Sequence, residues 1–140
     1  MIENQPNEIT LIFHSDKEED KKTRAYVETI EGFAIKTLDL KREKLTETQV
    51  AEIANKLDVT VLDMFDQNYT DRVKIESVRA LREQDAVTLL AKDPILMATP
   101  IIIIGEHAYQ FESSYDFIRE GATITGVREN PAANVEEKDN

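Results

Sequence analysis

The chain has 140 residues, 41% of them hydrophobic, which fits one compact domain with an adequate core. Its 17 basic and 28 acidic residues give a net charge of -11, which repels nucleic-acid phosphates and anionic membrane surfaces but permits a protein partner with a basic surface. It has no cysteine, which excludes disulfides, thiolate metal sites and thiol catalysis by this chain.

The sequence shows no targeting or membrane segment. Residues 1–8 have neither the basic end nor the apolar stretch of a signal peptide, and no stretch reaches the 18 or so apolar residues that a membrane helix needs. We therefore expect a cytoplasmic protein. Only His14 and His107 could serve as soft metal ligands, and we expect no metal site and no resident cofactor.

The first third of the chain predicts a strand, a helix and a second strand. Residues 8–14 form a short apolar run typical of a buried strand. Ser15 and Glu18 have the spacing of a capping box, which predicts a helix from Ser15 to Gly32. Residues 33–40 then supply a second strand. Two strands joined by a helix of this length favour a parallel βαβ unit.

A second capping box begins the middle of the chain. Thr46 and Gln49 have the required spacing, and Leu45 and Val50 flank them as a hydrophobic staple. The apolar residues that follow fall on one helical face. This pattern predicts a helix that begins just after Thr46.

Helical character continues up to a proline. The apolar residues of 61–65 predict a short helix, and the polar residues 67–74 predict a surface loop. Residues 83–93 predict a further helix, which Pro94 ends because its ring cannot continue the hydrogen-bond ladder.

The last part of the chain predicts a hairpin, a helix and a tail. Residues 101–104 and 108–111 are apolar runs separated by a turn, which favours an antiparallel hairpin. Ser113 can cap a final helix that ends at Gly121, and residues 122–140 predict a disordered acidic tail. The expected organisation is an N-terminal extension over residues 1–7 and one domain over 8–121, with a helical insertion at about 46–93.

Two sequence pieces carry a family resemblance. The first is residues 93–103, DPILMATPIII, which are similar to a helix end, a proline, a leucine-rich turn and an Arg-Pro-Ile-Val-like strand start. The second is residues 12–15, IFHS, which are similar to a Tyr-His-Asn segment. Together with the order of elements over about residues 8–120, they resemble the arsenate reductase (ArsC) family and its Spx-like relatives. The resemblance implies an α/β, thioredoxin/glutaredoxin-like three-layer fold. Its four-stranded mixed sheet would combine the parallel βαβ unit with the C-terminal antiparallel hairpin, interrupted by the helical insertion.

The resemblance also indicates what this chain lacks. In that family a nucleophilic cysteine lies at a helix N-terminus, where the dipole and free amides lower the thiol pKa and hold an oxyanion. Aligned from His14, Glu18 takes the cysteine's position, and its carboxylate would fill the anion pocket. The family's arginine before a cis-proline is here Thr99, and no arginine can be matched to its second oxyanion-binding arginine. The resemblance further predicts that the Thr99–Pro100 bond is cis.

These residues define a candidate vestigial site and groove: His14, Ser15, Glu18, Thr99 and Pro100. Glu18 has two interpretations, a catalytic acid or base and a simple capping carboxylate. His14 is either a general base or a strand-end histidine with local hydrogen bonds. The capping and strand-end interpretations are the more common ones, so we assign no catalytic residue.

The sequence therefore favours a redox-inactive, cysteine-less binding or regulatory module with a protein partner. A Spx-like role would place RNA polymerase among the candidate partners, by fold-level analogy alone. One alternative is a residual arsenate reductase or glutathione-dependent transferase that uses Ser15, His14 and bound glutathione. Another is a dimerising scaffold, and the oligomeric state stays open.

Overall fold

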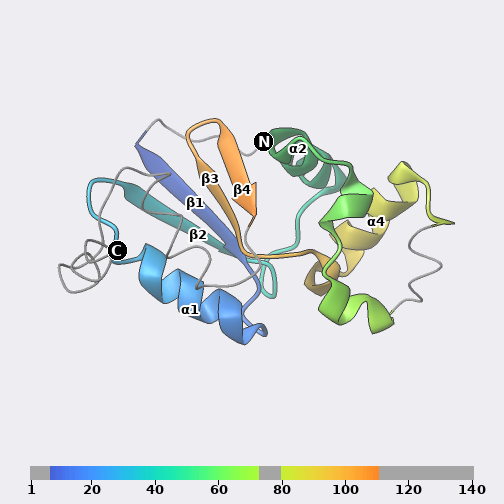
Figure 1. Ribbon diagram of the computed structural model, residues 1–140, viewed down its shortest axis with the longest axis horizontal. Helices are drawn as coiled ribbons and strands as arrows, with labels where there is room; N and C mark the ends of the chain where they lie inside the picture. Colours follow the sequence, from blue (N-terminus) through green and yellow to red (C-terminus); the bar gives the residue numbers. More distant parts are fainter. Residues whose placement is uncertain (1–6, 73–79, 111–140) are drawn as a thin grey trace, which may run out of the picture.

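A four-stranded mixed sheet forms the centre of the molecule (Figure 1). The computed structural model describes residues 7–72 and 80–110. Strands β1 (Glu8–Phe13) and β2 (Ala34–Asp39) run parallel, whereas β3 (Ile101–Ile104) is antiparallel to β1 and β4 (His107–Gln110) is antiparallel to β3. The order β2-β1-β3-β4 confirms the predicted combination of a βαβ unit with a hairpin.

Helices cover the sheet and form the insertion between β2 and β3. The helix α1 (Glu18–Val27) lies against the sheet, and α2 (Glu47–Leu57) and α4 (Glu83–Lys92) lie on the insertion side (Figure 1). Three short 3-10 helices complete the described elements: η1 (Val61–Met64), η2 (Gln67–Arg72) and η3 (Pro94–Leu96).

The two central strands are buried on both faces, which explains their continuous apolar sequences. Alternate side chains of β1 and β3 point to opposite sides of the sheet. One set packs with Val27 of α1: Ile9, Leu11, Phe13 and Ile102. The other set packs with α2 and α4: Ile12, Ile101 and Ile103. The sheet is thus the middle of three layers.

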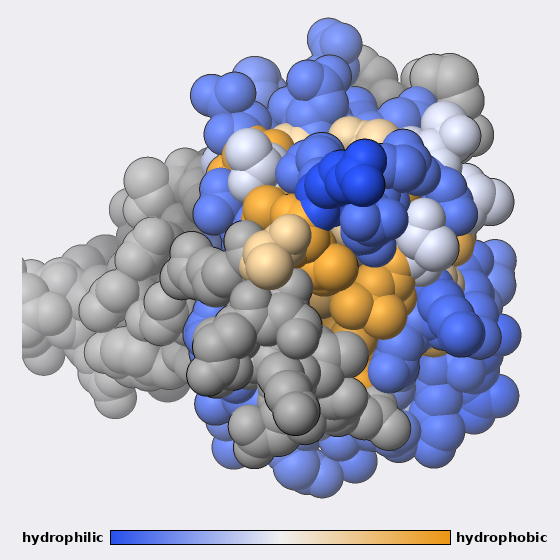
Figure 2. All heavy atoms as spheres, turned by 90° about the vertical axis from the view of Figure 1, so that its right-hand side faces the viewer, coloured by the Kyte–Doolittle hydropathy of each residue, from blue (hydrophilic) through white to orange (hydrophobic). Residues whose placement is uncertain are grey.

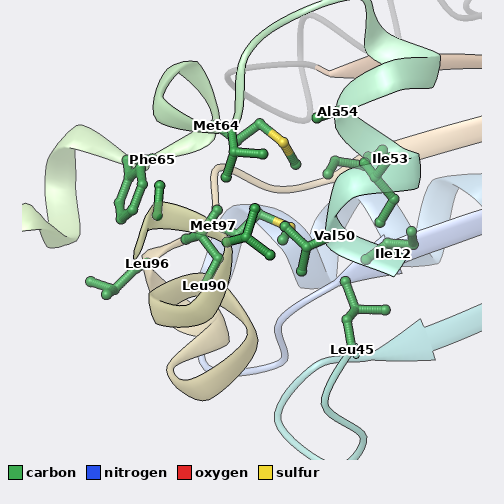
Figure 3. Close-up of a cluster of buried hydrophobic side chains, with 14 of the residues drawn as sticks. Ile12, Leu45, Val50, Ile53, Ala54, Met64, Phe65, Leu90, Leu96 and Met97 are labelled. Atoms are coloured by element: carbon green, nitrogen blue, oxygen red, sulfur yellow. The ribbon is translucent and has the colours of Figure 1, made fainter. Parts of the chain in front are cut away.

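The larger core cluster joins the insertion to the sheet (Figure 3). Ile12 of β1 and Ile53 of α2 belong to the same cluster as Met64, Leu90 and Met97. The backbones of Phe65 and Met97 form an isolated antiparallel bridge. This bridge ties the segment after η1 to the segment before Pro100.

The core of the insertion reaches the surface on one face. Figure 2 views the molecule from the insertion side and shows a hydrophobic stretch framed by hydrophilic residues. The partly buried apolar side chains of the insertion that pack against the core cluster are Leu57, Leu62, Tyr69, Leu81, Leu89 and Ala91.

The predicted start of the first helix is wrong. The helix begins at Glu18, with Lys17 as its N-cap and no side-chain capping bond, rather than at a Ser15–Glu18 capping box. The reason is that Ser15 is engaged elsewhere: its backbone N–H donates to Asp39 at 3.0 Å. The helix also ends at Val27, earlier than predicted, and Gly32 adopts a positive φ of 88° in the turn before β2.

The prediction for the middle of the chain is confirmed at its helices and wrong at its loop. Thr46 caps α2, and the reciprocal capping bonds with Gln49 are both present. Residues 67–74 were predicted as a loop, but Gln67–Arg72 forms the 3-10 helix η2, whose first turn is fixed by the bond from Tyr69 N–H to the Asp66 carbonyl. The predicted Ser113-capped helix and the acidic tail lie outside the described residues. No helix within the described residues is long and apolar enough to cross a membrane.

We expect the capping box of α2 to stabilise the whole domain, because α2 contributes Val50 and Ile53 to the core. Replacing Thr46 by Ala should lower the free energy of unfolding by about 1 kcal/mol, the typical value of an N-cap, measured by urea denaturation. Thr48→Ala on the exposed side of the same helix is the matched control and should change it little. Equal losses in the two variants would contradict the capping role.

Candidate functional site

The site lies where the loop after β1 meets the segment that leads into β3. His14, Ser15 and Asp16 connect β1 to α1. The carboxyl ends of the parallel strands β1 and β2 share one edge of the sheet, which brings Asp39 to this loop. The Thr99–Pro100 peptide bond, just before β3, is cis.

Lys17 is the buried cation of the site. Its side chain is 6% exposed, and Nζ donates to Asp66 Oδ2 at 2.8 Å and to the Met97 carbonyl at 2.7 Å. Nζ also lies 4.7 Å from the centroid of the Tyr69 ring, a cation–π contact. One ammonium group therefore connects the start of α1 to η2 and to the segment before Pro100.

Asp20 is the buried carboxylate of the site. Its Oδ2 accepts the backbone N–H of His14 at 2.9 Å and the hydroxyl of Thr99. Burial raises the pKa of Asp20, although these two hydrogen bonds and the positive charge of Lys17 oppose the rise. The first turns of α1 thus fix both the end of β1 and the residue before Pro100 through one side chain.

Asp39 holds the loop from the side of β2. Its Oδ1 accepts the backbone N–H groups of Ser15 and Lys41, each at 3.0 Å, and the Ser15 side chain also hydrogen-bonds to Asp39. Partial burial raises the pKa of Asp39, but these hydrogen bonds outweigh burial and leave the pKa below its usual range. Ser15 is therefore bound to a weakly basic carboxylate.

His14 makes local hydrogen bonds. The residue is 5% exposed, and its Nδ1 accepts the backbone N–H of Asp16 at 3.2 Å. Burial lowers the pKa of His14, so the imidazole is neutral at pH 7. In this position Nδ1 is oriented toward the backbone of the turn.

Glu18 does not occupy the place that the sequence suggested. Its side chain is 78% exposed and pairs with Lys21 at 3.1 Å on the surface of α1. The expectation that its carboxylate fills an anion pocket is wrong, because the N-cap is Lys17 rather than Ser15, two residues later than the capping box implied, and Lys17 is the side chain that turns inward. Thr99 and Pro100 do lie beside the start of α1, through the bond from Thr99 to Asp20.

A pocket of about 580 Å³ opens next to Thr99. Two backbone bonds fix its walls: Ala98 N–H donates to the Met64 carbonyl, and Asp66 N–H donates to the Leu96 carbonyl, both at 2.7 Å. Gln110 of β4 donates to the Ala98 carbonyl at 2.6 Å. The lining residues come from η1, η2, β4 and the segment before Pro100: Asp63, Phe65, Asp66, Gln67, Asn68, Ala98, Thr99 and Gln110. We call this space the Thr99 pocket.

The Thr99 pocket does not resemble a metal site. Within residues 7–72 and 80–110, no three histidine, aspartate or glutamate side chains are grouped so that they could hold a metal ion. Six of the eight lining residues are nevertheless polar. The pocket therefore suits a ligand that forms hydrogen bonds.

Solved structures share this arrangement of elements. A candidate arsenate reductase from Yersinia pestis superposes with a TM-score of 0.67 at 14% identity, over 79% of this chain and 98% of that one. The arsenate reductase from Vibrio cholerae gives 0.66 at 13% identity, over 82% and 98%. The chain has the fold of these arsenate reductase-like proteins. An ArsC-related protein from Brucella melitensis gives 0.62 at 14% identity, over 83% and 94%.

The similarity to the ArsC-like structures is one of fold. No protein-family model matches the sequence, and no curated protein matches it either. At such low identities the shared fold carries no residue roles, which must be argued from this chain's own side chains. The thioredoxin-like fold that the resemblance implied is confirmed.

Sequence reasoning missed the charged residues that organise the site after β1. The spacing of Asp20, Thr23 and Val27 places them on one helical face, and all three are buried. Reading this face as core would have flagged the carboxylate. The parallel pairing of β1 and β2 could likewise have placed Asp39 beside Ser15. Nothing in the sequence pairs Lys17 with Asp66, 49 residues further along the chain.

We expect the pair of Lys17 and Asp66 to be important for stability. Lys17→Met should lower the free energy of unfolding by about 3 kcal/mol, because it leaves a largely buried carboxylate without its cation. Combining it with Asp66→Asn should recover part of the loss in a double-mutant cycle. Lys21→Met removes an exposed pair and should cost less than about 0.5 kcal/mol, measured by the same urea denaturation. Similar losses for the two lysine variants would contradict this role.

We expect Asp20 and Asp39 to give stability opposite dependences on pH. The pKa of Asp20 is raised, so its contribution is present below its ordinary pKa of 3.8 and is lost as the pH rises through the folded value. The pKa of Asp39 is lowered, so its contribution is present above 3.8 and is lost as the pH falls through the folded value.

Urea denaturation of the wild type, Asp20→Asn and Asp39→Asn between about pH 3 and about pH 7 measures both effects. The stability of the wild type relative to Asp20→Asn should fall as the pH rises above 3.8. Its stability relative to Asp39→Asn should fall as the pH drops below 3.8. A constant difference in either pair would refute the corresponding pKa shift.

Proposed function

We propose that this protein is a redox-inactive binding module with an ArsC-like fold, and that it binds an extended peptide segment of a protein partner in the Thr99 pocket. The observation that carries the proposal is that one part of the site is filled by side chains and the other part is open. The space around the start of α1 is filled by the contacts of Lys17, whereas a pocket of about 580 Å³ stays open beside Thr99.

The absence of cysteine supports a role without thiol chemistry. The other candidate groups are also poorly arranged for nucleophilic catalysis. Ser15 hydrogen-bonds to Asp39 rather than to the neutral imidazole of His14, and the pKa of Asp39 is lowered. A nucleophilic serine needs an adjacent base that can take its proton, and Asp39 is a poor base. This geometry disfavours the alternative of a residual reductase or transferase.

The shape and chemistry of the Thr99 pocket support peptide binding. Its volume lies in the range of ligand sites, and residues of η2 and β4 line it. Amide side chains of Gln67, Asn68 and Gln110 line it together with the segment from Ala98 to Thr99. Amides both donate and accept hydrogen bonds, as a peptide backbone requires.

The walls of the Thr99 pocket are held in place before any ligand binds. The bridge between Phe65 and Met97, the bond from Gln110 to Ala98 and the ammonium of Lys17 all hold backbone that surrounds it. A preformed site loses less conformational entropy when it binds. A binding role is therefore compatible with the rigid packing seen here.

A nuclear magnetic resonance titration of the labelled protein tests the proposal. We expect a mixed peptide pool to shift the backbone amides of residues 66–68, 98–99 and 110, and glutathione or arsenate to leave them unchanged. Gln110→Ala should weaken peptide binding about tenfold, because it removes a hydrogen-bonding wall of the pocket. Glu106→Ala, in the turn of the same hairpin, is the control and should bind as the wild type does.

Two outcomes would count against the proposal. If no peptide shifts these amides while the spectrum stays that of the folded protein, the pocket is not a peptide site. If glutathione-dependent arsenate reduction exceeds the blank without enzyme and is lost in Ser15→Ala, the protein is an enzyme after all.

A further inference from the structure

We propose that the Thr99 pocket selects a cationic side chain, that of an arginine or lysine in the bound peptide. This inference rests on the proposed binding function and names the chemical class of its ligand. It is drawn from the charges around the pocket, which differ from those an oxyanion would need.

The Thr99 pocket is bordered by carboxylates, and its described lining residues include no cation. Asp63 and Asp66 both line it, and none of its eight lining residues is a lysine or arginine. An anion placed there would be repelled by both carboxylates. The pocket therefore disfavours arsenate and the carboxylates of glutathione.

Lys17 neutralises one of these two carboxylates and has little left to offer a ligand. Its ammonium donates to Asp66 and to the Met97 carbonyl and contacts the ring of Tyr69. Two of the three N–H groups of the ammonium thus donate hydrogen bonds, and the Tyr69 ring covers part of the group. Lys17 thus acts as part of the wall.

Asp63 is the carboxylate available to a cation. It is exposed at the rim of the pocket and accepts one hydrogen bond, from the Thr60 hydroxyl to Oδ2 at 2.9 Å. Among the described residues it has no ion pair within 4 Å. Within the part of the chain that the structure describes, its negative charge has a hydroxyl partner but no cationic one, unlike the charge of Asp66.

The neighbouring groups complete a site for a cationic donor. The side-chain amides that line the pocket add acceptor oxygens beside Asp63, and guanidinium and ammonium groups carry only donors. The net charge of -11 also favours encounter with a basic partner surface. The Thr99 pocket therefore combines a fixed shape, one carboxylate without a cationic partner among the described residues, and several acceptors.

The test compares two capped tripeptides, Gly-Arg-Gly and Gly-citrulline-Gly, in a titration followed by the amides of residues 63–68. Citrulline has the shape of arginine without its charge, so any difference reports charge recognition. We expect the arginine peptide to bind at least about fivefold more tightly, and the advantage to shrink as salt is added. Gly-Lys-Gly shows whether the pocket prefers a guanidinium or an ammonium group.

Two variants test which carboxylate recognises the cationic side chain of the peptide. Asp63→Asn should remove the advantage of the arginine peptide, whereas Asp85→Asn, at an exposed position of α4 outside the pocket, should keep it. Both changes alter the net charge equally, so a difference between them cannot come from long-range attraction. Identical behaviour of the two variants would overturn the role of Asp63.

The outcomes separate this inference from the proposed function. Equal binding of the arginine and citrulline peptides overturns the cationic preference and leaves peptide binding intact. Failure of all three tripeptides, with shifts from other peptides of the mixed pool, also overturns only the preference. If no peptide of any kind shifts the pocket amides, both proposals fail.

Discussion

The ammonium group of Lys17 links the parts of the site that are far apart in sequence. It joins the start of α1 to Asp66 and to the Met97 carbonyl, which are 49 and 80 residues away along the chain. The desolvation of a buried ion is costly, so a lone lysine would not stay in this place. Its two hydrogen bonds and the ring of Tyr69 offset that cost only when α1, η2 and the segment before Pro100 are all in position. The insertion and the sheet are therefore placed relative to each other by charge as well as by apolar packing.

Three acidic residues each hold a different part of the site. Asp20 is buried and holds the end of β1 next to Thr99, Asp39 holds the turn after β1, and Asp66 balances Lys17. Each carboxylate accepts hydrogen bonds from backbone or side-chain donors, as buried charges require. The region around the start of α1 is thus occupied by internal partners, and the open space lies beside it, in the Thr99 pocket.

The sequence predicted the parts of the fold that depend on local pattern. Apolar runs identified β1 and β3 because these strands are buried on both faces, and Thr46 with Gln49 identified the start of α2 because a capping box is a local interaction. The same reasoning was wrong at Ser15 and Glu18, where the spacing of a capping box is present but a tertiary contact forms instead. Asp39, 24 residues away, takes the hydrogen bonds of Ser15, so the helix begins at Glu18 and its side chain points to solvent. No local signal could foresee that competition. The long-range pairs that organise the site could not be predicted from the sequence for the same reason.

Lys17 and Asp20 also make the start of α1 a rigid support for the segment that leads into β3. The backbone from Met97 to Thr99 is then held from one side by Lys17 and Asp20 and from the other by Gln110. A segment fixed on both sides can present its pocket to a partner in a constant shape. The contacts that fill the space at the start of α1 therefore also fix the wall of the proposed binding pocket beside Thr99.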